Sequence, residues 1–174
     1  HGARAVVRLA APHMVDHAIM VRAAKGLEAD THLRVSEVVM QEVGPGHPLV
    51  VLCGPGFAHE VAQQLPTAVL AASVDTEATA VVQAEFRGPQ FRLYGSDDVV
   101  GVEIGGAMKN VIAIAAGVVE GLGLGHNALA ALITRGLAEI TRLACAAGGR
   151  RDTLAGLSGL GDLENILFIK PERI

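Results

Sequence analysis

The chain has 174 residues and a formal net charge of −4, and 51% of its residues are hydrophobic. A chain of this length forms one large domain or parts of two, with enough apolar residues for a sizeable core. The absence of a basic block argues against broad binding to nucleic acid or to a membrane surface. The two cysteines, Cys53 and Cys145, lie in unrelated contexts and favour a reducing compartment over a disulfide framework.

Short apolar runs alternate with helical patterns over the first 98 residues. The helical patterns, of which the first is weak, cover residues 10–20, 32–42, 57–64 and 76–86, and the strand patterns cover 21–24, 49–53, 67–73 and 91–94. We expect Asp75 to cap the fourth of these helices. The continuous run LVVLC at 49–53 predicts a buried parallel strand. The alternation as a whole predicts an α/β layer with crossover connections.

After Asp98 the strand patterns end and two helical patterns follow, at 99–119 and 127–147. We expect Asn127 to cap the second helix and Gly148 with Gly149 to end it. The sequence therefore predicts two domains: an α/β, Rossmann-like parallel-sheet portion over 1–98 and an all-α portion over 99–174. The longest apolar run, 111–119, is short and contains glycine, so we expect no membrane span. No signal peptide is visible. The chain begins with His1, inside the pattern, and we expect a further N-terminal part.

The helix predicted at 99–119 is long, largely apolar and glycine-rich, and it carries a single lysine, Lys109, in its middle. Glycine inside a helix costs roughly 1 kcal/mol relative to alanine. Gly101, Gly105 and Gly106 therefore predict a place where another segment or a ligand comes close to the helix backbone. Lys109 is then a candidate for chemistry on a ligand in that gap. The competing interpretation is a lysine that extends to solvent from the edge of a tightly packed helix pair.

Three further segments carry candidate functional residues. Gly54-Pro55-Gly56 follows a predicted strand and opens a helix, where anions and other ligands collect in open α/β sheets. Lys25 follows the strand pattern at 21–24 and could meet a phosphate at the same edge of the sheet. The glycine-rich segment at 156–161 presents Asp162. The alternatives are a plain strand–helix turn, a solvated surface lysine and an exposed aspartate in a loop between helices.

The seven histidines do not predict a metal site. His13 and His17 are four residues apart, but no carboxylate or cysteine accompanies them at ligand spacing. The sequence also contains no GxSxG, CxxC or P-loop motif. We therefore expect no metal-binding residues in this chain.

Taken together, these segments resemble the NAD(P)-dependent glycerol-3-phosphate dehydrogenases of the bacterial type. The resemblance covers most of residues 20–163, and its most specific part is GVEIGGAMKNVIAIAAGVVEGLGLG. The shorter matches are AAKGLE, CGPGFAHEVAQQLPTAV and GLSGLGDL. The resemblance implies an N-terminal Rossmann domain and a helical substrate domain. It also implies NAD or NADP as cofactor, a small phosphorylated substrate, a cytoplasmic protein and a homodimer as a candidate assembly.

The resemblance also implies roles for individual residues. Lys109 matches the catalytic lysine, which acts as general acid and base in the hydride transfer that interconverts dihydroxyacetone phosphate and sn-glycerol 3-phosphate. Lys25 matches a lysine that contacts both cofactor and substrate. Gly54 and Gly56 match substrate-binding positions. Ala58 matches a position that contacts the cofactor, and Asp162 matches an aspartate near the substrate.

Three departures from the family pattern concern the completeness of the site. The glycine-rich dinucleotide fingerprint of the first βα unit is absent, Gly56 stands where the family has serine or threonine, and residues 164–174 match nothing in the family. We therefore expect the chain as given to be inactive. Two alternatives remain open: a related lysine-dependent β-hydroxyacid or 2-keto reductase, and an inactive fragment that acts as a helical interaction module.

Overall fold

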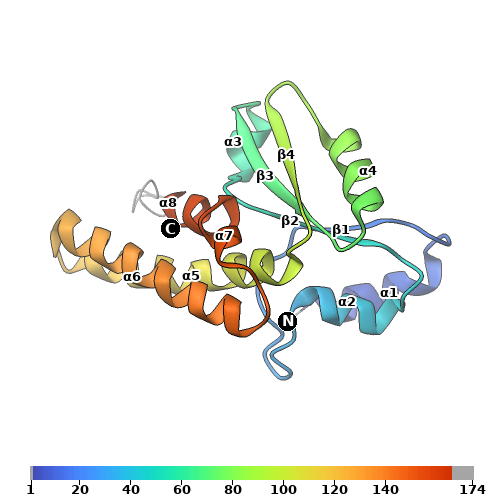
Figure 1. Ribbon diagram of the computed structural model, residues 1–174, viewed down its shortest axis with the longest axis horizontal. Coiled ribbons are helices and arrows are strands. Elements are labelled where there is room, and N and C mark those ends of the chain that lie inside the picture. Colours follow the sequence, from blue (N-terminus) through green and yellow to red (C-terminus); the bar gives the residue numbers. More distant parts are fainter. Residues whose placement is uncertain (1, 166–174) are drawn as a thin grey trace.

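A computed structural model describes residues 2–165, which form a small sheet with flanking helices and a pair of long helices at one end (Figure 1). The strands are β1 (Met20–Arg22), β2 (Leu49–Cys53), β3 (Thr67–Ala72) and β4 (Phe91–Ser96). The helices of the first half are α1 (Ala3–Ala10), η1 (Ala11–His13), α2 (Val35–Val43), α3 (Ala58–Ala62) and α4 (Thr76–Phe86). Those of the second half are α5 (Val99–Gly121), α6 (Gly125–Ala146), α7 (Arg151–Leu154), η2 (Leu157–Gly161) and α8 (Asp162–Glu164).

The strands form one sheet in the order β1-β2-β3-β4. Strands β1 and β2 are parallel, as are β3 and β4, which confirms the predicted α/β layer. The central pair, β2 and β3, is antiparallel, so the expectation that residues 49–53 form a purely parallel strand is wrong on one side. The reason lies in the connection between them. Helix α3 has only five residues and rises about 7 Å, which is too short to carry the chain back along β2 as a crossover helix does.

Helix α5 joins the two parts of the molecule. Its residue Val102 packs with Val51 and Cys53 of β2 and with Ala72 of β3 in one buried cluster. A second cluster lies among α5, α6, α7 and α8, and its buried members are Ile104, Ala116, Ile133, Ile140, Ala144, Leu154 and Leu163. The start of α5 is thus fixed against the sheet, while the rest of the helix pairs with α6.

Helix α5 has 23 residues and is, within residues 2–165, the single helix long and apolar enough to cross a membrane by length and composition. The run 111–119 is therefore only part of a longer apolar helix. Residues 101–107 are all buried inside the protein, against the sheet and the segment that carries η2. This part of α5 is core structure.

The predicted ends of the helices hold in some places and fail in others. Asp75 caps α4 by accepting a hydrogen bond from the Ala78 amide at 2.9 Å, as expected. Gly148 has a positive φ of 96° and ends α6, also as expected. The expected cap at Asn127 is wrong, because α6 already begins at Gly125 and its N-cap is Leu124, without a side-chain hydrogen bond.

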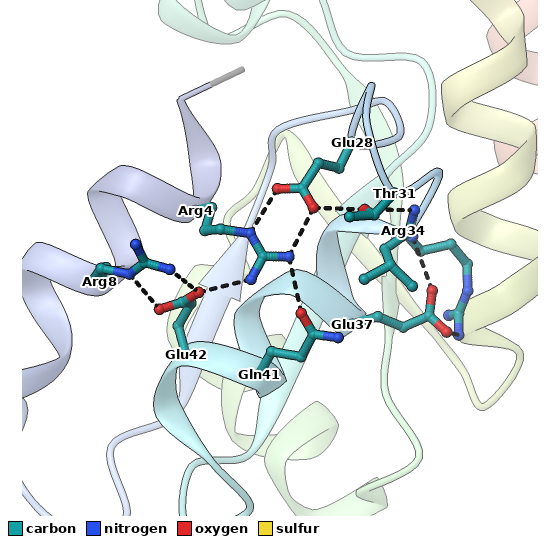
Figure 2. A network of polar contacts seen from close by, with 9 residues as sticks. Arg4, Arg8, Glu28, Thr31, Arg34, Glu37, Gln41 and Glu42 are labelled. Atoms are coloured by element: carbon teal, nitrogen blue, oxygen red, sulfur yellow. Dashed lines mark hydrogen bonds and ion pairs between the residues drawn. The ribbon is translucent and has the colours of Figure 1, made fainter.

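The weak helical pattern expected over 10–20 is also wrong, because the first helix covers Ala3–Ala10 instead. This helix packs on α2 through charged side chains, as Figure 2 shows. Arg4 pairs with Glu28 and Glu42, both at 2.7 Å, while Val6 and Leu9 are exposed. Residues 3–10 are amphipathic at helical spacing, but apolar periodicity would place Val6 and Leu9 on the inner side, whereas the arginines face α2.

Candidate active site

Two lysines from distant parts of the chain meet at one buried carboxylate. Lys25 Nζ lies 2.7 Å from Asp162 Oδ2, and Lys109 Nζ lies 3.0 Å from Asp162 Oδ1. The chain contains three lysines, of which the third, Lys170, lies outside the described residues. The side chain of Asp162 is 1% exposed, so its interpretation as an exposed loop residue is wrong. We call Lys25, Lys109 and Asp162 the lysine cluster.

The fold explains why these residues meet. Lys25 follows β1 and Gly54 follows β2, and the two strands are parallel neighbours, so their carboxyl ends lie at the same edge of the sheet. Lys25 Nζ donates a long hydrogen bond of 3.5 Å to the carbonyl oxygen of Gly54. Asp162 is the first residue of α8 and follows η2, which packs against both α5 and β3. Lys109 reaches the same point from the middle of α5.

The glycines of α5 make this approach possible, as the sequence predicts. A Cβ at Gly106 would lie 2.6 Å from Cys53 Sγ and 3.5 Å from Lys25 Cδ. A Cβ at Gly105 would overlap the carbonyl oxygen of Ser158 in η2. The stem of Lys25, the end of β2 and the backbone of η2 therefore all pack directly on the backbone of α5.

The turn at Gly54-Pro55-Gly56 borders the cluster on one side. Gly54 has a φ of 133° and is buried, and a Cβ there would lie 3.2 Å from Val69 Cα, so glycine is required. Phe57 follows this turn, and its ring centroid lies 6.0 Å from Lys109 Nζ. Gly56 and Ala58 are exposed at the turn and at the first residue of α3, outside the lysine cluster itself.

Cys53 belongs to the site, although the sequence analysis did not place it there. Its thiol donates to Asp162 Oδ2 at 3.5 Å, so Oδ2 accepts from both Cys53 and Lys25. Burial raises the pKa of this thiol to about 11; the Asp162 carboxylate acts in the same direction and Lys25 acts against it. The thiol therefore stays neutral near pH 7 and remains a donor. Its place directly before the glycine turn was the available signal.

A second buried carboxylate, Glu103, was missed as well. It lies on α5 with 1% of its side chain exposed and pairs with Arg22 and Arg34. The signal was a lone acidic residue inside an apolar helical run, since an unpaired buried carboxylate is costly and a partner must exist.

The charges of the lysine cluster favour an anionic ligand. Two lysine side chains face one carboxylate, so the formal charges of the cluster sum to one net positive charge. Lys25 is 27% exposed and Lys109 is 15% exposed, so both are reachable from solvent. The arrangement can bind a small anion and can give a proton to, or take one from, an oxygen atom beside it. Within residues 2–165, no group of three or more His, Cys, Asp or Glu side chains could hold a metal ion.

Comparison with known proteins gives one consistent result. The profile described as NAD-dependent glycerol-3-phosphate dehydrogenase N-terminus matches residues 1–79, and the profile for the C-terminus of the same enzymes matches residues 98–168. The match thus begins before residue 20 and extends beyond Leu163. The expectation that residues 164–174 match nothing in the family is therefore wrong for residues 164–168. Of these, residues 166–168 lie outside the part of the chain that the structure describes.

Similar proteins carry the same description. A glycerol-3-phosphate dehydrogenase [NAD(P)+] of Koribacter versatilis is 54% identical over 165 residues, which cover 94% of this chain and 49% of the relative. One of Acidobacterium capsulatum is 56% identical over 156 residues, covering 88% of this chain and 46% of the relative. The crystal structure of a glycerol-3-phosphate dehydrogenase from Coxiella burnetii has a TM-score of 0.91 at 40% identity and covers 98% of this chain and 52% of that one.

The chain spans about half the length of the curated relatives it matches. The structural neighbour covers the Rossmann-like portion and the helical portion alike, since 98% of this chain superposes on it. The chain belongs to the NAD-dependent glycerol-3-phosphate dehydrogenase family.

Proposed function

We propose that the protein carrying this chain interconverts dihydroxyacetone phosphate and sn-glycerol 3-phosphate with NAD or NADP as cofactor. The observation that supports this most is the lysine cluster, in which Lys25 and Lys109 share the buried carboxylate of Asp162 at the strand-end edge of the sheet. The relatives named glycerol-3-phosphate dehydrogenase [NAD(P)+] support the choice of reaction.

Lys109 is the general acid and base of the proposed reaction. Reduction of a ketone needs a proton at the carbonyl oxygen, and an ammonium group directed at that oxygen supplies it. Asp162 holds Nζ of Lys109 at 3.0 Å and keeps the long side chain in one direction. Phe57 limits the space on another side.

Lys25 binds the anionic end of the substrate and contacts the cofactor. It is the more exposed of the two lysines, and Asp162 and the Gly54 carbonyl orient its ammonium group. Gly54 and Gly56 form a turn without side chains beside it, which lets a ligand come close to the backbone. These two glycines are the proposed substrate-binding positions of the turn.

The residues present fit one side of a dinucleotide site. A reduced nicotinamide cofactor supplies the hydride in this reaction class. Lys25 carries a positive charge suited to a cofactor phosphate, and Ala58 at the exposed start of α3 presents no large side chain that would block it. Both are proposed contacts for NAD or NADP.

Further expectations from the sequence stay proposals. We propose a domain division at residues 98 and 99, a cytoplasmic protein without a membrane span, no nucleic-acid partner and a homodimer. The buried residues 101–107 of α5 support the absence of a span, since they already pack against protein.

A chimera tests the function. Residues 1–165 of this chain replace the matching segment of the Koribacter versatilis relative, and the unaltered relative serves as control. We expect the chimera to oxidise NADH or NADPH when dihydroxyacetone phosphate is added. A folded chimera that turns over β-hydroxyacids or 2-keto acids instead would support the related reductase. Absence of turnover with any of these substrates would contradict the proposal.

A further inference from the structure

We infer that Glu103 is a positioning residue, which holds the segment carrying Lys25 against α5 and thereby sets the place of Lys25 relative to Lys109. The consequence for catalysis rests on the proposed function. The positional claim itself rests on the geometry around Glu103.

The Glu103 carboxylate accepts four hydrogen bonds and is almost completely buried. Oε1 accepts from Arg22 Nη2 at 2.5 Å and from the Ser36 amide at 3.0 Å. Oε2 accepts from Arg34 Nη1 at 3.0 Å and, in a short contact, from the Ser36 hydroxyl. Such an arrangement fixes the carboxylate in both position and orientation.

The donors come from the two ends of one segment. Arg22 is the last residue of β1, and Arg34 and Ser36 stand at the start of α2. The segment 23–33 between them carries Lys25. Its two ends are therefore both bound to the same side chain of α5, which closes the segment against that helix.

The same helix carries Gly106, on which the stem of Lys25 packs, and Lys109, which shares Asp162 with Lys25. Gly106 lies three residues after Glu103, and Lys109 three residues after Gly106, so neighbouring members of this series lie close on the helix surface. The stem of Lys25 packs at Gly106, where a Cβ would lie 3.5 Å from Lys25 Cδ. Glu103 and Lys109 are six residues apart, which is about 9 Å along the axis. Glu103 thus holds the base of the segment, and Gly106 receives the stem.

Stability alone does not account for this arrangement. The cost of removing buried charges from water offsets much of the attraction between them, and apolar residues often serve a core equally well. Burial lowers the pKa of Arg22, and its Nε has no hydrogen-bond partner within the described structure, so the arginine is held at some cost. The ion pairs of Glu103 instead determine position, because they fix the segment 23–33 on α5.

Nuclear magnetic resonance of the 174-residue chain tests the position directly. The chain has three lysines, so selective 13C labelling of lysine gives few side-chain signals. We expect a nuclear Overhauser effect between the Lys25 side chain and the Hα atoms of Gly106. In Glu103→Gln this signal should lose at least about half its intensity, because the neutral amide no longer binds both arginines.

Two further variants keep this test decisive. Ser36→Ala removes one hydroxyl donor and leaves the charges in place, so it reports on the same contact if Glu103→Gln does not fold. Glu37→Gln is the matched control, since Glu37 pairs with Arg34 at 3.0 Å from the exposed side and does not touch Glu103. The Lys25–Gly106 signal should weaken in Ser36→Ala and persist in Glu37→Gln. If Glu103→Gln folds and its Lys25–Gly106 signal is unchanged, the inference is overturned. If Glu103→Gln does not fold, an unchanged signal in Ser36→Ala overturns it.

A double-mutant cycle in the chimera tests the catalytic consequence. Glu103→Gln should lower kcat/KM by about 10- to 100-fold, as small misplacement of a reacting group does. In a Lys25→Ala background the same change should cost less than about threefold, because the residue through which Glu103 acts is gone. Equal losses in both backgrounds would show that Glu103 does not act through Lys25. An inactive unaltered chimera would count against the proposed function and leave the resonance test of position standing.

Discussion

Gly106 of α5 lies so close to Cys53 of β2 that a Cβ on Gly106 would be 2.6 Å from the sulfur atom. This contact brings the edge of the sheet onto the backbone of the helix that carries Lys109. The glycine therefore does more than interrupt a helix: it sets how closely the two parts of the site approach.

Alanine at Gly106 should destabilise the chain, while alanine at Gly117 of the same helix should stabilise it. Nothing lies within 4 Å of a Cβ at Gly117, so the change gains helix propensity of about 0.5–1 kcal/mol. At Gly106 the same gain is outweighed by overpacking against Cys53, which costs about 1–3 kcal/mol. Urea unfolding of both variants measures the difference. Equal effects at the two positions would show that the contact is absent in solution.

The glycines of α5 also show which part of the site could be predicted from the sequence. The three glycines Gly101, Gly105 and Gly106 predicted a close approach to the helix backbone, because glycine in a helix needs a physical reason. The pattern could not name the approaching group. At Gly106 that group is Cys53 with the stem of Lys25, and their meeting depends on the parallel pairing of β1 with β2.

The parts that the sequence did not predict involve polar packing. Helix α1 is held by Arg4 and Arg8, and apolar periodicity would have placed this side of the helix in solvent. The antiparallel pairing of β2 with β3 follows from the shortness of α3, which was expected to be longer. The packing of α1 depends on contacts between segments distant in the chain, whereas the cap at Asp75 is local and was predicted correctly.

Removal of the Lys109 ammonium group should abolish most of the activity without unfolding the protein. In the chimera, Lys109→Met should lower kcat by about 10²–10⁴-fold, the usual contribution of a general acid and base. The fold should survive because Lys25 still neutralises the buried Asp162 carboxylate. Steady-state kinetics and a thermal melt check both statements, with Arg135→Met on the exposed face of α6 as control. A loss of less than tenfold would remove Lys109 from the mechanism.

Lys25 should distinguish phosphorylated from unphosphorylated substrates. Lys25→Met in the chimera should reduce kcat/KM for dihydroxyacetone phosphate more than for dihydroxyacetone, because only the former has a phosphate to pair with the ammonium group. Lys109 continues to pair with Asp162 in this variant. If both substrates lose the same factor, Lys25 does not bind the phosphate.

The ion pairs around Arg4 should make the chain sensitive to acid. Hydrogen bonds from Arg4 lower the pKa of Glu28 to about 2, and those from Arg8 and Arg4 lower that of Glu42 to about 2, from an ordinary 4.5. A carboxylate whose pKa is lower in the folded state stabilises that state above pH 4.5. This contribution is lost as the pH falls from 4.5 to 2.

Arg4→Gln should therefore flatten the fall of Tm between pH 4.5 and pH 2. Thermal melts at half-unit steps of pH measure this, and Arg135→Gln, at an exposed pair on α6, is the control. Parallel curves for the unaltered chain and Arg4→Gln would mean that the arginine does not hold the two carboxylates in solution.

The two cysteines should differ sharply in their reaction with a thiol reagent such as 5,5′-dithiobis(2-nitrobenzoate). The reagent is attacked by the thiolate, and burial raises the pKa of Cys53 to about 11, so only about one Cys53 thiol in a thousand is ionised at pH 8. Cys53 is also buried, whereas Cys145 is exposed on α6. One thiol per chain should react rapidly, and the second only after unfolding in denaturant.

The same raised pKa predicts a loss of stability in alkali. The unfolded chain releases the Cys53 proton near pH 9, while the folded chain keeps it to about pH 11, so stability falls as the pH rises through this interval. Cys53→Ala should flatten the curve of unfolding free energy between pH 9 and pH 11 relative to the unaltered chain.

The variant Cys145→Ser is the control for both cysteine predictions. Its rapid thiol reaction should disappear, and its unfolding free energy between pH 9 and pH 11 should follow that of the unaltered chain. A rapidly reacting thiol left in Cys145→Ser would show that Cys53 is not enclosed between Gly106 and Asp162.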